Sequence, residues 1–228
     1  MTRIYIFIIS VLLTIPFAQA QETDSLPGRV EKFGIRAGVN LYKPVRSFLD
    51  NNYSGFEVMG DIRIYKKYYV AVEIGKEQKT SHDDNISSKG SGTYFKAGFD
   101  YNAHNNWGNL NNMIFGGVRY GVSTFNQELL SYSIAYSNPL FGDDIRDTPI
   151  EYTGLSAHWL ELAAGVKTEV LNNLYLSITL QLKRRMSDKA PDNFENLFIP
   201  GFGRTYENSK FGAGFSYGIS YLIPIYKK

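Results

Sequence analysis

A strict two-residue alternation in the segment 174–185, LYLSITLQLKRR, restricts the fold of this chain more than any other feature. Leucine or isoleucine occupies every second position from Leu174 to Leu182, and Ser, Thr, Gln and Lys fill the positions between them. Successive side chains of a β-strand point to opposite faces, so this period predicts a strand with one apolar and one polar face. The pattern leaves open whether the apolar face points into a protein core or out into lipid.

The same alternation recurs in eight segments of about ten residues or a little more. Helical periodicity is missing from them, and Tyr and Phe are abundant, with 17 and 15 residues. Ten tilted strand residues rise roughly 25 Å, about the height of the apolar band of an outer-membrane barrel. The sequence therefore predicts an all-β fold with strands at 33–42, 55–65, 68–77, 93–102, 113–124, 158–170, 174–184 and 211–223.

The connections between these segments alternate in length. The short connections are 66–67, 103–112 and 171–173, and the long ones are 43–54, 78–92, 125–157 and 185–210. If the first strand starts in the periplasm, every short connection is periplasmic and every long one is extracellular. This asymmetry, with an even strand number, predicts an eight-stranded antiparallel up-and-down transmembrane β-barrel with short periplasmic turns and long extracellular loops.

The N-terminal residues have the organisation of a secretory signal. Arg3 precedes an apolar run that is too short for a transmembrane anchor, and Ala18-Gln19-Ala20 forms an A-x-A cleavage site. We therefore expect a signal peptide at 1–20, a periplasmic leader at 21–32 and the barrel at 33–228. The chain has no cysteine, which excludes disulfides and thiolate metal sites, and its net charge of +2 is spread without basic blocks. Nothing in this charge pattern indicates a nucleic-acid partner.

The charged residues in the middle of the predicted strands all fall on the face opposite the bulky apolar residues. These eleven residues are Arg36, Glu57, Asp61, Arg63, Glu73, Lys96, Asp100, Arg119, Glu161, Lys167 and Lys183. Lys76 and Arg184 fall on the apolar face, but at the outer strand ends, where headgroups and water can solvate them. A soluble lipocalin-like carrier would have the same alternation turned inside out, with the apolar face lining a cavity.

Three further features favour lipid on the outside. Small residues such as Gly75 and Gly121 share the polar face with the charges, as a crowded narrow interior requires. The six basic and five acidic residues are nearly balanced, and an unpaired buried charge is costly. Tyrosines lie at strand ends, as in an aromatic girdle: Tyr42, Tyr65, Tyr68, Tyr101, Tyr175 and Tyr221. We therefore expect the charges to form a salt-bridged plug that leaves no open pore.

With these features the chain resembles the small eight-stranded outer-membrane barrels of the OmpA/OmpX type. It is more similar still to barrels of unknown function from Bacteroidota that are related to PorT-like proteins, through YKKYYVAVEIG at 65–75 and the Gly/aromatic final strand. The resemblance implies the outer membrane of a Gram-negative bacterium and contact with outer-membrane lipid and lipopolysaccharide. It also implies an envelope protein partner, as for an accessory component of an export or assembly machine. The chain departs from such barrels at its end, where Lys227 and Lys228 follow Tyr226.

Catalytic and metal-binding patterns are weak. The three histidines form no H-x-H or HExxH spacing, so we expect neither a metal nor another cofactor. Some eight-stranded outer-membrane barrels modify lipid A with His and Ser, which draws attention to His158 beside Ser156 and Glu161. Their spacing of two and three residues puts these side chains partly on opposite faces of a strand. We expect a non-enzymatic protein, with a lipid A-modifying enzyme as an alternative.

The loop segment 193–206, NFENLFIPGFGRTY, is richer in apolar residues than a solvated loop. It is expected either to fold over the barrel mouth as a lid or to present a contact surface. Its candidate binding residues are Phe194, Phe198, Phe202 and Arg204.

Overall fold

The computed structural model describes residues 32–83, 85–104, 112–134, 144–191, 194–206 and 208–227. All of them belong to one compact unit, Glu31–Lys228. The predicted signal peptide, and all but the last residue of the predicted leader, lie outside the described residues. No helix in the described part of the chain is long and apolar enough to cross a membrane.

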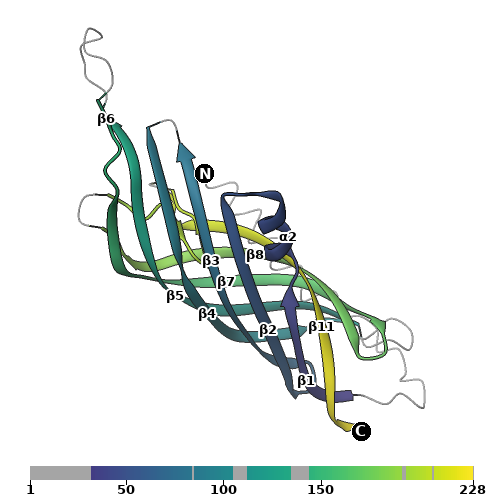
Figure 1. Cartoon of the computed structure of the whole chain (residues 1–228). Coiled ribbons are helices and arrows are strands. Elements are labelled where there is room, and N and C mark those ends of the chain that lie inside the picture. Colours follow the sequence, from purple (N-terminus) through teal and green to yellow (C-terminus); the bar gives the residue numbers. More distant parts are fainter. Residues whose placement is uncertain are drawn as a thin grey trace, which may run out of the picture. The chain divides into compact units, whose positions relative to one another are not determined.

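Eight long strands of the described residues form a closed antiparallel ring (Figure 1). They are β1 (Lys32–Asn40), β2 (Tyr53–Tyr65), β3 (Tyr68–Asp83), β4 (Ile86–Asn102), β5 (Met113–Ile134), β7 (Ile150–Leu171), β8 (Leu174–Lys189) and β11 (Phe211–Lys227). Each strand pairs with the next of these along the chain, and β1 pairs with β11 to close the ring. The predicted all-β, eight-stranded up-and-down barrel is confirmed.

Three short strands and a helix complete the fold: β6 (Asp144–Arg146), β9 (Phe198–Ile199), β10 (Gly203–Arg204) and α2 (Tyr42–Leu49). β6 pairs with the outer end of β5, and β9 pairs with β10 inside the connection between β8 and β11.

Two of the predicted short turns are confirmed. Lys66 and Lys67 join β2 to β3, and Asn172 and Asn173 join β7 to β8. Lys66 has a φ of 37° and Asn173 a φ of 66°, in the left-handed region that asparagine tolerates better than most residues. The third short connection contains residues 105–111, which lie outside the described residues.

The strands extend further on the outer side than predicted. The predicted loop 78–92 is mostly strand, because β3 and β4 stay paired until Asp83 lies opposite Ile86. β5 and β7 likewise extend through parts of the predicted loop 125–157. Above the apolar part of the barrel both strand faces can be polar, so the apolar alternation stops before the backbone pairing does.

The helix α2 lies in the predicted loop 43–54, and the first strand ends at Asn40 rather than at Tyr42. The Asn40 side chain accepts a hydrogen bond from the Tyr42 N–H at 2.9 Å, two residues further on, in an Asx-type turn that leads into the helix. Pro44 occupies the first turn, where backbone N–H groups have no partner inside the helix. Eight residues are too few for helical periodicity to appear clearly in the sequence.

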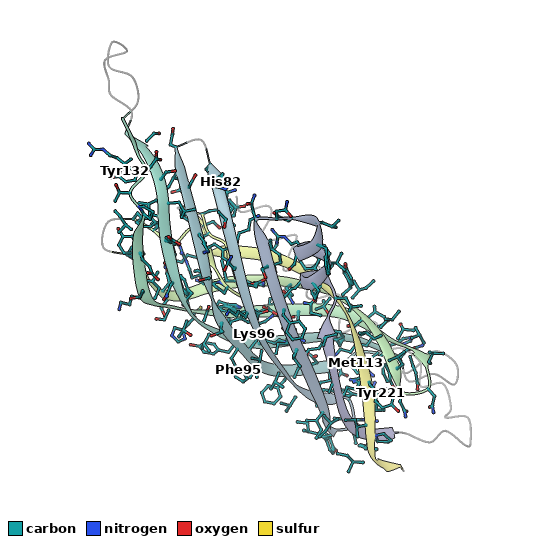
Figure 2. All side chains as sticks on the ribbon, in the orientation of Figure 1. His82, Phe95, Lys96, Met113, Tyr132 and Tyr221 are labelled. Carbon is teal, nitrogen blue, oxygen red and sulfur yellow. The ribbon has the colours of Figure 1, made fainter. Side chains whose placement is uncertain are left out.

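Apolar and polar side chains separate between the two faces of the barrel wall. On β8 the four residues Leu176, Ile178, Leu180 and Leu182 are 45–63% exposed, whereas the residues between them are buried. Phe95 and Lys96 of β4 show the same contrast, since Phe95 is exposed and Lys96 is buried (Figure 2). We call the exposed apolar side chains of the wall the apolar belt: Ile35, Phe56, Val58, Ile62, Ile64, Val72, Ile74, Phe95, Phe99, Val118, Leu160, Leu162, Val166, Leu176, Ile178, Leu180, Leu182, Phe211, Phe215 and Ile223.

The tyrosines at strand ends do not all belong to this outer face. Tyr65, Tyr68, Tyr101 and Tyr221 are exposed, as an aromatic girdle requires. Tyr175 is buried, and its ring lies 5.2 Å from the Arg36 guanidinium inside the barrel. The prediction was wrong for Tyr175. This residue lies between Leu174 and Leu176 in the alternating pattern, so its side chain points to the polar, inner face.

Candidate functional site

A chain of ion pairs begins in the barrel interior near the end that carries the short turns. The Arg36 guanidinium lies 2.6 Å from the Asp61 carboxylate, which also contacts the Lys167 ammonium at 2.7 Å. Lys167 lies 3.7 Å from Asp100, and Asp100 lies 3.2 Å from Arg119. Cations and carboxylates therefore alternate across strands that are distant in sequence.

The centre of the barrel continues this alternation on four neighbouring strands. Arg119 lies 2.7 Å from Glu73 and 3.6 Å from Glu161. Lys96 makes a short ion pair with Glu73 and lies 3.5 Å from Glu161. The strand register explains the arrangement, because Glu73 is directly opposite Lys96 and Arg119 is directly opposite Glu161.

At the outer end the network reaches α2. The Lys43 ammonium lies 2.5 Å from Glu77 and 3.9 Å from Glu57. Glu77 also accepts hydrogen bonds from the Tyr53 hydroxyl and the Gly201 N–H, both at 2.6 Å. Glu77 stands beyond Ile74, the last belt residue of β3. Burial alone would raise the pKa of Glu77, but Lys43 and these hydrogen bonds lower it to about 2.

Nine of the eleven predicted interior charges are buried: Arg36, Glu57, Glu73, Lys96, Asp100, Arg119, Glu161, Lys167 and Lys183. Asp61 is nearly so, with a side chain 9% exposed. Arg63 is placed differently, at the turn end, where its Nε donates to the Lys66 carbonyl and its guanidinium lies 4.6 Å from the Phe33 ring centroid. The sequence reasoning missed Glu77 and Lys43. Glu77 is the last residue of the predicted strand 68–77 and lies on the same face as Glu73, so the alternation already contained the signal for it.

The predicted lid segment is divided between the interior and the surface. Phe198 and Phe202 are both buried, and Phe202 belongs with Ile199 to a cluster that includes Trp159. The Phe202 and Trp159 rings meet edge to face with centroids 6.0 Å apart. This part of the connection between β8 and β11 therefore folds into the barrel mouth.

The other two predicted residues of this segment lie apart from that cluster. Phe194 packs edge to face on Tyr152 of β7, with ring centroids 5.1 Å apart. Arg204 is exposed and pairs with Asp83 of β3 at 3.1 Å. The four residues thus anchor the segment at several points and do not converge on one pocket.

Lys183 of β8 holds the lid segment 193–206 in place from the barrel interior. Its ammonium donates to the carbonyl oxygens of Gly201 and Phe202, at 2.8 and 3.3 Å. Within the described residues no carboxylate lies within 4 Å of this ammonium, unlike those of Lys43, Lys96 and Lys167.

Two cavities lie along the barrel. The smaller, about 20 Å³, is lined by the lower ion pairs around Arg36, Asp61 and Lys167, and has room for about one water molecule. The larger, about 270 Å³, lies between α2, the lid segment and strands β8 and β11. The ion pairs of Lys96 and Arg119 separate the two cavities.

The geometry separates Glu161 from His158. Its ring lies on the outer face, with Nδ1 3.2 Å from the Tyr120 hydroxyl, whereas Glu161 is fully buried on the inner face. Among the described residues there is no group of three His, Asp or Glu side chains that could hold a metal ion.

An eight-stranded antiparallel ring with an apolar outer face and a polar, side-chain-filled interior is the architecture of the small outer-membrane β-barrels. The chain belongs to the family described as Domain of unknown function (DUF6048), whose match covers residues 1–228. No curated protein matches the sequence significantly.

Two solved structures are similar to this chain over 86% of its length and the whole of theirs. One is Neisserial surface protein A (NspA), with 10% sequence identity and a TM-score of 0.42. The other is a major outer membrane protein from Thermus thermophilus, with 15% identity and a TM-score of 0.41.

Proposed function

We propose that this chain is a non-enzymatic protein of the outer membrane of a Gram-negative bacterium, and that it acts through its extracellular side. The observation that carries the proposal is the separation of side chains across the wall. The apolar belt surrounds the barrel, while the cations and carboxylates pair inside it. An apolar surface this extensive is unfavourable in water and favourable in a bilayer.

Cell fractionation tests the location. We expect the protein in the sarkosyl-insoluble envelope fraction, and we expect its band on a gel to migrate faster before boiling than after it. Release into osmotic-shock fluid without detergent would contradict the proposal and favour a soluble lipocalin-like carrier.

The interior supports a barrel that does not conduct ions. The Lys167–Asp61 ion pair joins β7 to β2 across the interior, and Arg119 and Lys96 pair with Glu73 and Glu161 beside it. Desolvated pairs of this kind are costly to break by removing one partner. Purified protein in a planar lipid bilayer should therefore give no steady conductance steps above those of protein-free bilayers. Large, reproducible steps would contradict the filled interior.

A second candidate function is that of an accessory component of an export or assembly machine, as in the PorT-like proteins. It is favoured by the outer extensions of β3, β4, β5 and β7, which continue above the apolar belt and offer a paired sheet surface outside the bilayer. Affinity purification after in-cell crosslinking should then recover an envelope protein partner. Recovery of none would remove this candidate.

The lipid A-modifying alternative has a direct test of its own. Deletion of the gene should leave the mass spectrum of lipid A unchanged if the protein is non-enzymatic. A missing or added acyl chain in the deletion strain would overturn that part of the proposal.

A further inference from the structure

The barrel wall is interrupted on its outer side between β2 and β11. β1 pairs with β11 only up to Asn40 opposite Gly218, and with β2 only up to Val39 opposite Val58. Within the described residues, the outer part of β11, residues 211–217, pairs only with β8, and the outer part of β2, residues 53–57, pairs only with β3. Two strand edges therefore face each other across a gap that β1 is too short to fill.

The gap runs from the outer part of the apolar belt, where Tyr217 lies opposite Ile178, to the outer strand ends, where Phe211 lies opposite Arg184. Phe56 on β2 and Phe211 and Phe215 on β11 are belt residues of the two strands that border it, and each is about half exposed. A polar backbone edge at this height needs a hydrogen-bond partner, because the hydrocarbon region of a bilayer offers none.

α2 covers part of the gap (Figure 1). The Leu41 N–H donates to the Tyr217 carbonyl at 2.9 Å, and the Gly55 N–H donates to the Ser47 hydroxyl at 2.9 Å, so one edge group on each side is satisfied by the α2 region. The outer side of α2 is apolar, since Phe48 and Leu49 are 87% and 82% exposed.

The 270 Å³ cavity lies behind α2 and reaches into this gap. Its lining includes Gly214 and Ser216 from the inner face of β11, and also Ala213 and Phe215 from the outer face. These four consecutive residues belong to the part of β11 that pairs only with β8. The cavity is therefore bordered by the strand edge that faces the gap.

The charges that line this cavity favour an anion. Its carboxylates are already engaged, Glu77 by Lys43 and Tyr53, and Glu57 by hydrogen bonds from Asn40 and Tyr94. Lys183 differs from them, because this buried ammonium contacts only two carbonyl oxygens among the described residues. A second cation, Arg46, also lines the cavity, where it stacks on the Tyr53 ring, 4.1 Å from its centroid, and lies 3.6 Å from the Asp50 carboxylate.

We propose that the gap between β2 and β11 is a lateral binding site for an anionic lipid of the outer leaflet. The phosphate-bearing headgroup lies in the cavity near Lys183 and Arg46, and the acyl chains remain outside, against Phe215 and the apolar side of α2. The proposal rests on the proposed function in requiring that the barrel lie in a membrane.

The test uses the purified full chain in a neutral detergent, with bound lipid counted by native mass spectrometry. Dioctanoyl phosphatidylglycerol should bind as one molecule per protein, at least tenfold more tightly than dioctanoyl phosphatidylcholine with the same chains. Lys183→Gln should weaken phosphatidylglycerol binding by about tenfold or more, as expected for loss of one charge-assisted contact. Lys66→Gln, an exposed cation in the turn between β2 and β3 at the opposite end of the barrel, is the matched control and should leave binding unchanged.

A second variant keeps the proposal falsifiable if Lys183→Gln fails to fold. Ala213→Trp on the exposed face of β11 should narrow the opening and weaken phosphatidylglycerol binding without disturbing the buried ion pairs. Equal binding of both lipids, or binding unaffected by either variant, would overturn the proposal. Displacement of the lipid by millimolar inorganic phosphate would also overturn it, in favour of a free-anion site. Each of these results would contradict the lipid site alone, because the protein would still be found in the outer-membrane fraction. Failure of the proposed function would instead place the protein in another fraction.

Discussion

Replacing Arg119 by methionine tests whether the barrel interior is a desolvated network of paired charges. The guanidinium lies 2.7 Å from Glu73, 3.2 Å from Asp100 and 3.6 Å from Glu161, and its removal leaves one negative charge without compensation. Methionine has a comparable length and is apolar, so the change removes charge with little loss of volume.

The expected loss of stability can be worked out from the cheapest way for the folded variant to remove the excess negative charge. That way is for one carboxylate to take up a proton. Glutamate has an ordinary pKa of about 4.3, so protonation at pH 7 costs about 3.7 kcal/mol, at ~1.36 kcal/mol per pH unit. This agrees with the roughly 3–5 kcal/mol that follows removal of one partner from a buried ion pair. We therefore expect Arg119→Met to lower the free energy of unfolding by about 3–4 kcal/mol at pH 7.

The assay is urea unfolding of the folded barrel in detergent micelles, followed by tryptophan fluorescence and by the loss of the fast-migrating gel band. Because protonation becomes easier as the pH falls, the deficit of the variant should shrink by about 1.4 kcal/mol per pH unit between pH 7 and about pH 5. The double variant Arg119→Met/Glu161→Gln, which restores the charge balance, should recover much of the loss. A deficit below about 1 kcal/mol that does not change with pH would refute the reasoning, since it would mean that water solvates these charges.

Two other predictions concern the packing of Gly121 against Trp159 and the ion pair between Lys43 of α2 and Glu77. A Cβ at Gly121 would lie 2.2 Å from the Trp159 ring, whereas a Cβ at Gly116 would meet nothing within 4 Å. Gly121→Val should therefore abolish the fast-migrating folded band, and Gly116→Val should retain it. The pKa of Glu77 is lowered to about 2 in the folded state, so its pairing with Lys43 stabilises the fold fully above the ordinary pKa of 4.5 and less as the pH falls toward 2. The stability deficit of Glu77→Gln in urea unfolding should be constant above about pH 5 and shrink below it, and a deficit that grows on acidification would contradict this assignment.

The eight strands could be predicted from the sequence because lipid-facing and interior positions alternate without interruption. The period of two in Leu176, Ile178 and Leu180 belongs to any strand with one apolar face, so it located the strand without fixing its direction. Whether the apolar face points inward or outward depends on the long-range closure of the ring. The sequence contained only indirect evidence of this, chiefly the balanced charges on the polar face.

The candidate site depends on features that alternation does not encode. α2 interrupts the pattern for only eight residues, and its Lys43 reaches Glu77 across 34 positions of sequence. The apolar character of the lid segment was visible, but its destination was not, because Phe202 meets Trp159 only once the mouth of the barrel has formed. The gap beside β1 follows from a difference in strand length, and the sequence placed the end of β1 two residues too far along.

The pairing of β1 with β11 has a consequence for how the molecule is made. The two strands that close the ring stand at opposite ends of the described chain, so this seam cannot form until β11 has been synthesised. Contacts between such distant residues slow folding, because a long stretch must be ordered before they are gained. Until then β1 and β11 each expose a strand edge without its hydrogen-bond partner, and a helper protein that holds either edge would prevent aggregation.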